Sequence, residues 1–285
     1  MAKSIKELLT TAVAVEGQKL IERKIYDTLI EAVLKKLIGR AQAAIVVPPG
    51  EIPGSSIDIN LVTPDSMRVY KIAEGAAVPL DVEAYTYFNM KPEKYAVRIA
   101  VTKEMLEDGK WNLIEHNIKK AGIEIAENED LLVIQDALDN AANTVTGGAA
   151  IAISDMTRAM QFLEDLDYSP THMFAGPEVC NDIRNIDTFV EANKLGTREM
   201  FETGFVGRIY GMDIIRFSRN VAPSTTYSKY AYIIDRDHAF IIAEKRPMTV
   251  ENYDDSIHDL SGAVVTQRIK VRQLRAEAIC KITTT

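Results

Sequence analysis

The longest helical pattern in the chain runs from residue 111 to residue 140. Its apolar residues recur at intervals of three and four, which places them on one face of a helix: Ile114, Ile118, Ala121, Ile125, Leu132 and Ala137. Asn112 and Glu115 stand three apart at its start, as the two residues of a helix capping box do. A helix of this length would extend about 40 Å, so the pattern predicts a rod that lies along a sheet.

Three alternating patterns precede this helix and predict strands. Apolar and polar residues alternate over residues 57–61 and again over 82–88, and we expect these two runs to pair as a long β-hairpin. The segment 73–79 between them is small and polar, and a hairpin tip without a core of its own is usually mobile or held by a neighbour. The third run, residues 95–101, leads to Thr102, which we expect to cap a short helix.

The pattern beyond residue 148 predicts an alternation of helices and strands. Helices are expected at residues 155–166, 177–183 and 188–195, and strands at 172–175, around 209, and at 212–217, 231–235 and 239–243. Longer alternating runs follow and predict strands at 248–252, 264–271 and 276–282. We expect these last strands to form an antiparallel sheet over the apolar face of the long helix.

The N-terminal forty residues carry another helical pattern, from residue 4 to about Gly39. A wide apolar stripe lies along its second half: Leu20, Ile21, Ile25, Leu29, Val33, Leu34, Leu37 and Ile38. Such a stripe must be covered, and three interpretations stay open: packing within its own domain, against another subunit, or against a captured peptide. Residues 46–54 then predict an extended linker rich in proline and glycine.

Composition and charge restrict the class of protein. The 285 residues are 47% hydrophobic and 26% charged, which is typical of a soluble globular chain. The net charge of −8 argues against a surface that binds nucleic acid over the whole molecule, because phosphate binding needs a basic footprint. Residues 1–40 are mildly basic by contrast. Neither a membrane-spanning run nor a signal-peptide pattern is present, so we expect a protein made in the cytoplasm without a membrane partner.

The cysteines and histidines offer little candidate chemistry. Cys180 and Cys280 are too few for a disulfide framework or a thiolate zinc site, and we interpret both as buried small hydrophobes in a reducing compartment. Asp235, Asp237 and His238 come closest to a metal-binding cluster, but their spacing is more typical of a solvated turn between two buried strands.

The glycines and the acidic residues of the long helix add no site either. Three glycines between residues 204 and 211 match no dinucleotide or phosphate-binding loop, and tight turns explain their spacing. Glu127, Glu129 and Asp130 are typical of a solvated helix face, although two such carboxylates can line a cleft. From the residues alone we predict no catalytic, cofactor-binding or metal-binding residue, and no enzyme.

Five stretches of the chain follow one another in the order found in a known family. They are residues 74–79 (EGAAVP), 101–108 (VTKEMLED), 207–215 (GRIYGMDII), 233–242 (IIDRDHAFII) and 248–251 (MTVE). Their order and spacing resemble those of the major capsid proteins of tailed phages, which have the HK97 fold. The resemblance covers nearly the whole chain and depends on the sequence of parts rather than on any one motif.

The resemblance implies an α+β fold of the HK97 type in four regions. These are an N-terminal arm (residues 1–53), an extended β-hairpin or E-loop (54–92), a peripheral domain (93–150 and 240–285) and an α/β axial domain (151–239). In the peripheral domain, the helix at residues 111–140 would be the spine helix and would lie on an antiparallel sheet.

The function implied by the resemblance is structural. Copies of the chain would assemble as pentamers and hexamers into an icosahedral shell around double-stranded DNA, in a virion made in the host cytoplasm. A portal and a separate scaffolding protein are implied partners, and no cofactor is. The basic residues of the arm would suit a surface that faces the DNA: Lys3, Lys6, Lys19, Arg23 and Lys24.

One feature departs from the family pattern. Only about fifty residues precede the hairpin, whereas many members carry a long scaffolding region that is cut away, so assembly would depend on a separate scaffold or on none. Some members also cross-link a hairpin lysine to an asparagine of a neighbour. Lys71 lies in roughly that region, but the sequence indicates no partner for it.

Two alternatives stay open. The first is an encapsulin, a cellular nanocompartment of the same fold that encloses cargo enzymes, in which the helix at residues 20–38 would hold cargo peptides. The second is an α/β enzyme with a cleft between two domains, which requires a cluster of titratable groups that the sequence does not reveal.

Overall fold

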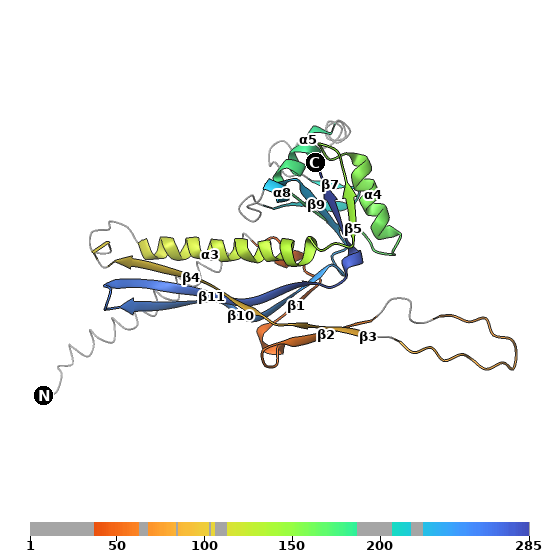
Figure 1. Cartoon of the computed structure of the whole chain (residues 1–285), viewed down its shortest axis with the longest axis horizontal. Coiled ribbons are helices and arrows are strands. Elements are labelled where there is room, and N and C mark those ends of the chain that lie inside the picture. Colours follow the sequence, from red (N-terminus) through yellow and green to blue (C-terminus); the bar gives the residue numbers. More distant parts are fainter. Residues whose placement is uncertain are drawn as a thin grey trace.

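The computed structural model describes residues 37–62, 68–83, 85–102, 104–105, 113–186, 207–217 and 225–284. Within these ranges, a long helix lies along a four-stranded sheet, an α/β part follows at one end of the helix, and a two-stranded hairpin projects from the sheet (Figure 1). The helices predicted over residues 4–36 and 188–195 lie outside the described residues. Leu37–Gly39, which the N-terminal helix was expected to reach, are not helical.

The long helix is confirmed from residue 113 to residue 138. Helix α3 (Leu113–Leu132) continues into η3 (Val133–Leu138), a segment with the wider π-helical turn. The predicted apolar face is buried: Ile118, Ala121 and Ile125 pack with Ala263 and Val265 of the sheet below. Residues 111–112, and with them half of the expected capping box, lie outside the described residues.

The sheet beneath this helix has the strand order β1-β10-β11-β4. Its strands are β1 (Ile45–Val47), β10 (Phe240–Asp255), β11 (Leu260–Gln273) and β4 (Glu93–Thr102). The three long strands are antiparallel, as the alternation predicts, whereas β1 runs parallel to β10. The Thr102 hydroxyl accepts a hydrogen bond from the Met105 backbone N–H at 3.3 Å, which confirms it as a helix cap.

Strand β10 corrects one expectation. The sequence predicts two strands, at residues 239–243 and 248–252, whereas the structure has one strand of 16 residues. Pro247, which suggests a break, lies where the register with β11 shifts, between Arg246 and Thr249. A bulge tolerates a residue that cannot donate to the ladder, so the strand continues past the proline.

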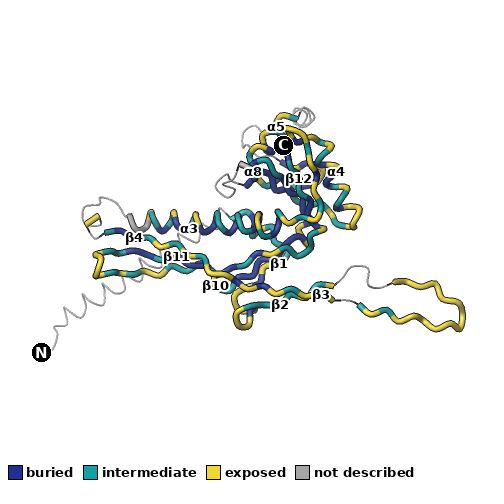
Figure 2. The backbone as a smooth tube through the Cα atoms, viewed as in Figure 1, coloured by how far each residue is buried: buried dark blue, intermediate teal, exposed yellow. Residues whose placement is uncertain are grey.

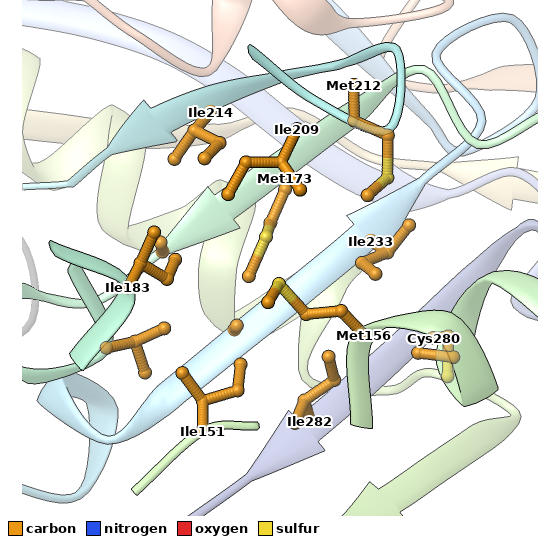
Figure 3. Close-up of a cluster of buried hydrophobic side chains, with 14 of the residues drawn as sticks. Ile151, Met156, Met173, Ile183, Ile209, Met212, Ile214, Ile233, Cys280 and Ile282 are labelled. Carbon is orange, nitrogen blue, oxygen red and sulfur yellow. The ribbon is translucent and has the colours of Figure 1, made fainter. Parts of the chain in front are cut away.

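The α/β part contains a six-stranded sheet in the order β5-β12-β9-β6-β8-β7. The strands are β5 (Asn143–Thr146), β6 (His172–Ala175), β7 (Arg208–Ile209), β8 (Met212–Arg216), β9 (Tyr230–Ile234) and β12 (Ile279–Thr283). Its helices are α4 (Ile153–Glu164), α5 (Pro177–Asn185) and α8 (Thr225–Ser228). One face of the sheet contributes to a core in which Met156, Met173 and Ile233 meet (Figure 3).

The sequence-based prediction places the last strand in the wrong sheet. The strand expected at residues 276–282 was placed with the two long C-terminal strands, on the helix. Instead η4 (Ala276–Ala278) redirects the chain, and β12 pairs with β5 in parallel and with β9 antiparallel. Ile279 and Cys280 are both fully buried, so β12 is covered on both faces and its periodicity carries no information about which sheet it joins.

A shared core connects the two parts. Residues of η3, among them Ile134 and Leu138, pack with Phe174 of the α/β sheet and with Phe240 of β10. Directly after η3, the Asp139 carboxylate accepts hydrogen bonds from Lys281 at 2.5 Å and from the Tyr232 hydroxyl at 3.3 Å. The end of the long helix is thereby fixed to both sheets.

The predicted hairpin is confirmed at its base. Strand β2 (Ile57–Val62) pairs antiparallel with β3 (Tyr85–Met90), and residues 68–83 continue beyond them without regular structure. Figure 2 shows that this segment extends away from the rest of the molecule and is exposed along most of its length. Two short 3-10 turns, η1 (Arg40–Gln42) and η2 (Pro49–Glu51), precede the hairpin.

The close approach of β11 and β4 yields a stability prediction. A Cβ atom added to Gly262 would lie 2.0 Å from the carbonyl oxygen of Ile99 on the neighbouring strand. We expect Gly262→Ala to lower the free energy of unfolding by about 2 kcal/mol or more, measured by urea denaturation. Gly148→Ala is the matched control, since no atom lies within 4 Å of its added Cβ. Equal midpoints for the two variants would contradict the prediction.

Candidate assembly site

The root of the hairpin is firmly attached to the sheet. Val47, Ile52 and Met90 are buried against Ile241 and Ala243 of β10, which forms a small core under the strands β2 and β3. This core is apolar because alternate residues of both hairpin strands point toward the sheet. The hairpin therefore leaves the molecule from a fixed base.

Cationic side chains of the sheet add hydrogen bonds to the same root. Arg272 donates to the carbonyl oxygen of Asn89 at 3.1 Å, and its guanidinium lies 4.6 Å from the centre of the Phe88 ring. Lys245 donates to the Ile52 carbonyl at 2.6 Å, and Arg275 to a carbonyl of β2 at 2.8 Å. These contacts connect backbone carbonyl oxygens of the hairpin, and of the segment just before it, to the body of the molecule.

The distal part of the hairpin has the opposite character. Val69 is fully exposed and Leu80 is 88% exposed, and further large apolar side chains around them are exposed too: Val62, Tyr70, Ile72, Val78, Val82, Tyr85 and Tyr87. Asp81 organises the two sides of the segment, because it accepts hydrogen bonds from the Arg68 N–H at 2.8 Å and from the Tyr70 hydroxyl at 3.1 Å. A projecting surface of this apolar content is typical of a protein–protein contact.

A buried polar junction fixes the chain just before the hairpin. Arg40 of η1 makes an ion pair with Glu129 of α3 at 2.7 Å and another with Glu244 of β10 at 2.8 Å. Gln267 of β11 donates to the second oxygen of Glu129 at 2.8 Å. Burial by itself lowers the pKa of Arg40, but the two carboxylates outweigh it and raise that pKa above its ordinary value. One guanidinium thus connects the N-terminal segment, the long helix and the sheet.

Asp130, next to Glu129, binds backbone N–H groups of the same N-terminal segment. Its carboxylate accepts hydrogen bonds from the N–H of Ile38 at 3.1 Å and of Gly39 at 2.8 Å. Gly39 has no room for a side chain, since an added Cβ would lie 2.8 Å from Val133. Burial raises the pKa of Asp130 from 3.8 to about 6, against the hydrogen bonds from Gly39 and Ile38.

The sequence-based interpretation of these carboxylates is therefore wrong. Glu129 and Asp130 were expected on a solvated face but are 1% and 4% exposed, and only Glu127 of the three is partly exposed. Their partners Arg40 and Gly39 lie about ninety residues earlier in the chain. No local spacing reports such a pairing, so sequence reasoning missed this junction.

The other candidates from the sequence lie apart from this region. Asp235 is buried in the turn between β9 and β10, where it accepts from the Asp237 N–H at 3.1 Å and contacts His238 at 2.9 Å. It therefore organises the predicted turn. Cys180 and Cys280 are free and buried, as predicted, and burial raises the pKa of Cys280 to about 12. Among the residues that the structure describes, no three acidic, histidine or cysteine side chains are grouped to hold a metal ion.

A family of known proteins matches the sequence. The family model described as "Phage capsid protein" matches residues 87–273, which is more than half of the chain. No curated protein matched the sequence. None of the described helices has the length and apolar character needed to cross a membrane.

Solved phage structures share the fold at low sequence identity. A chain from Microbacterium phage Oxtober96 has a TM-score of 0.68 at 15% identity, over 87% of this chain and 90% of that chain. A chain from Gordonia phage Cozz has a TM-score of 0.68 at 13% identity, over 88% and 87% of the two chains. The mature capsid of bacteriophage PhiM1 gives 0.66 at 12% identity, over 87% of each chain.

The Arg40 junction predicts a large cost when one partner is removed. Arg40→Ala leaves the buried carboxylate of Glu129 without its cation, and we expect a loss of about 3 kcal/mol in the free energy of unfolding. Arg158→Ala, at an exposed position on α4, serves as the control for loss of an arginine and should change stability far less. Chemical denaturation of the purified chain measures both, and comparable losses would contradict the assignment.

Asp130 predicts a pH-dependent difference in stability. Its folded pKa of about 6 lies above the ordinary value, so the folded chain binds the proton more tightly and the contribution of Asp130 to stability falls as pH rises from about 4 to about 6. An asparagine at this position would accept the same two N–H groups without a charge. We expect Asp130→Asn to be more stable than the parent at pH 7.5, by up to about 3 kcal/mol, and the difference to disappear near pH 4. A pH-independent difference in urea denaturation would contradict this.

Proposed function

This chain belongs to the phage capsid protein family, and from this premise we propose that it is the major capsid protein of a tailed virus. In this proposal, copies assemble as pentamers and hexamers into an icosahedral shell that encloses double-stranded DNA. The observation that carries the proposal is the hairpin, whose root is fixed by a core and by Arg272 while its distal apolar side chains are exposed and not covered by any other described part of the chain. Such a surface is stable only when a neighbouring subunit covers it.

The regions of an HK97-type subunit can be assigned to this chain. We assign the arm to residues 1–53, the E-loop to 54–92, the spine helix to α3 and η3, and the sheet of the peripheral domain to β4, β10 and β11. The axial domain then comprises residues 151–239 together with β5 and β12, because β5 pairs with β12 and β12 pairs with β9. This last assignment revises the boundary drawn from the sequence alone.

The partners beyond the chain itself follow from the same proposal. The basic residues of the arm would face the packaged DNA, a separate scaffolding protein and a portal would take part in assembly, and the assembled protein would reside in the virion. Membership in a capsid family favours this structural role over the enzyme alternative. It also favours a viral shell over an encapsulin.

Electron microscopy tests the proposed function directly. We would purify the full chain and compare negative-stain images with its elution in size-exclusion chromatography. Uniform shells, or rings of five and six subunits, are the expected result. A monomer that never assembles at high concentration, in crowding agents or with a co-expressed scaffold would refute it.

The apolar side chains of the hairpin supply a sharper prediction. Val69→Ser with Leu80→Ser removes two exposed side chains that contribute nothing to the core, so the unfolding midpoint should not change while the yield of shells falls at least about tenfold. The matched control is Leu166→Ser, a 47% exposed leucine in the turn after α4. Normal shell yield from the double variant would show that the hairpin is not an assembly surface.

A further inference from the structure

The open face of the four-stranded sheet carries an unusual row of positive charge. Arg246 of β10 lies directly opposite Arg268 of β11, which in turn lies directly opposite Lys94 of β4. We call these three residues the cationic row. Strands are about 4.8 Å apart, so three like charges lie within about 10 Å, and like charges in opposite positions destabilise a sheet.

The row has no acidic partner within the described residues. Arg268 donates to the carbonyl oxygen of Pro92 at 3.3 Å, and the structure shows no carboxylate within ion-pair distance of Arg246, Arg268 or Lys94 in the part of the chain that it describes. Arg246 and Lys94 are exposed. Repulsion among these like charges lowers the stability of the free subunit, and an anionic group that docks on the row reduces this repulsion.

The edge strand β4 continues the exposed face beyond Lys94 with small and cationic side chains. The residues that follow Lys94 on the same face are Ala96, Arg98 and Ala100, all of them exposed. The guanidinium of Arg98 lies 4.5 Å from the centre of the Tyr253 ring, so its position is held on the sheet. Small and cationic side chains therefore alternate along this face, with Ala96 between Lys94 and Arg98 and Ala100 beyond Arg98.

The opposite end of the same sheet has the complementary composition. The turn between β10 and β11, residues 254–259, contains Asp254, Asp255 and Asp259 around Ile257, which is 89% exposed. We call this turn the acidic tip. The hydrogen bond from His258 lowers the pKa of Asp255, which keeps that carboxylate ionised. The tip presents one apolar side chain surrounded by negative charge, and it lies at the end of the sheet far from the α/β part (Figure 1).

The acidic tip cannot reach the cationic row of its own chain. Eight residues of β11 separate Leu260 from Arg268, which is about 26 Å along a continuous strand. A second copy has no such restriction. We propose that the acidic tip of one subunit docks on the cationic row and the Ala96–Ala100 segment of a neighbouring copy, with Ile257 on the alanines and the aspartates beside Lys94 and Arg98.

A contact of this kind joins two different surfaces, so it repeats from copy to copy and closes into rings or shells. The inference rests on the proposed function and specifies one of its interfaces. Double-stranded DNA is the competing occupant of the row. The apolar side chains favour the protein, because Ile257 of the tip can pack on the exposed Ala96 and Ala100, whereas a duplex would place charged phosphates there.

Charge reversal on each surface tests the contact. Lys94→Glu lowers the formal charge of the row from +3 to +1, and Asp254→Lys lowers the negative charge of the tip from −3 to −1, so each variant alone weakens the attraction and should raise the critical concentration for assembly about tenfold or more. In the double variant Lys94→Glu/Asp254→Lys, the lysine on every tip meets the glutamate on a neighbouring row, so assembly should recover toward that of the parent in five-membered as well as six-membered rings. Light scattering at low salt measures all three samples, and Lys120→Glu on the exposed side of α3 is the matched control.

The outcomes separate the two levels of the proposal. If the parent chain does not assemble, the proposed function fails. If the parent and Lys94→Glu assemble alike, or if the double variant assembles as poorly as either single variant, the docking inference is wrong while the function stands. Normal shells from Lys94→Glu that no longer retain DNA would assign the row to DNA and also overturn it. Ile257→Ser provides a second tip variant that leaves every charge in place, and it too should weaken assembly.

Discussion

Everything in this subunit depends on the packing of one long helix against a sheet and then into a second core. The apolar face of α3 lies on β11, and the wider turns of η3 carry Ile134 and Leu138 into the core shared with the α/β part. Arg40 then fastens the N-terminal segment to the same helix through Glu129. Because helix, sheet and segment meet where Arg40 pairs with two buried carboxylates, Glu129 and Glu244, the direction of each is set by the others.

The hairpin illustrates how this rigid body is used. Its root is held by an apolar core and by cationic side chains that donate to its carbonyl oxygens, whereas its distal half exposes valine, leucine and tyrosine. Monomeric soluble proteins rarely expose an apolar surface of this kind to water. A subunit of a shell can expose it in the free chain, because a neighbouring subunit buries the same area in the assembly. The same logic applies to positive charge gathered on the sheet of an acidic chain of net charge −8.

Much of the local structure follows from the sequence. The 3.6-residue period of Ile118, Ala121 and Ile125 predicts the long helix, the alternation over residues 57–61 predicts the hairpin, and Thr102 is recognisable as a helix cap. These features depend on neighbours a few positions away, so the local order of residues is sufficient to specify them. The order of these parts also indicates the family, although no single motif does.

Only the tertiary structure decides the long-range pairings. Glu129 and Asp130 look like surface carboxylates in the helical pattern, and their burial follows from an arginine and a glycine about ninety residues away. Strand β12 is buried on both faces at Ile279 and Cys280, so its alternation cannot choose between two sheets, and the turn at Ala276–Ala278 directs it to β9. Period and spacing report which face of an element is apolar. Which surface covers that face, and which charges it buries, is fixed only when distant segments meet.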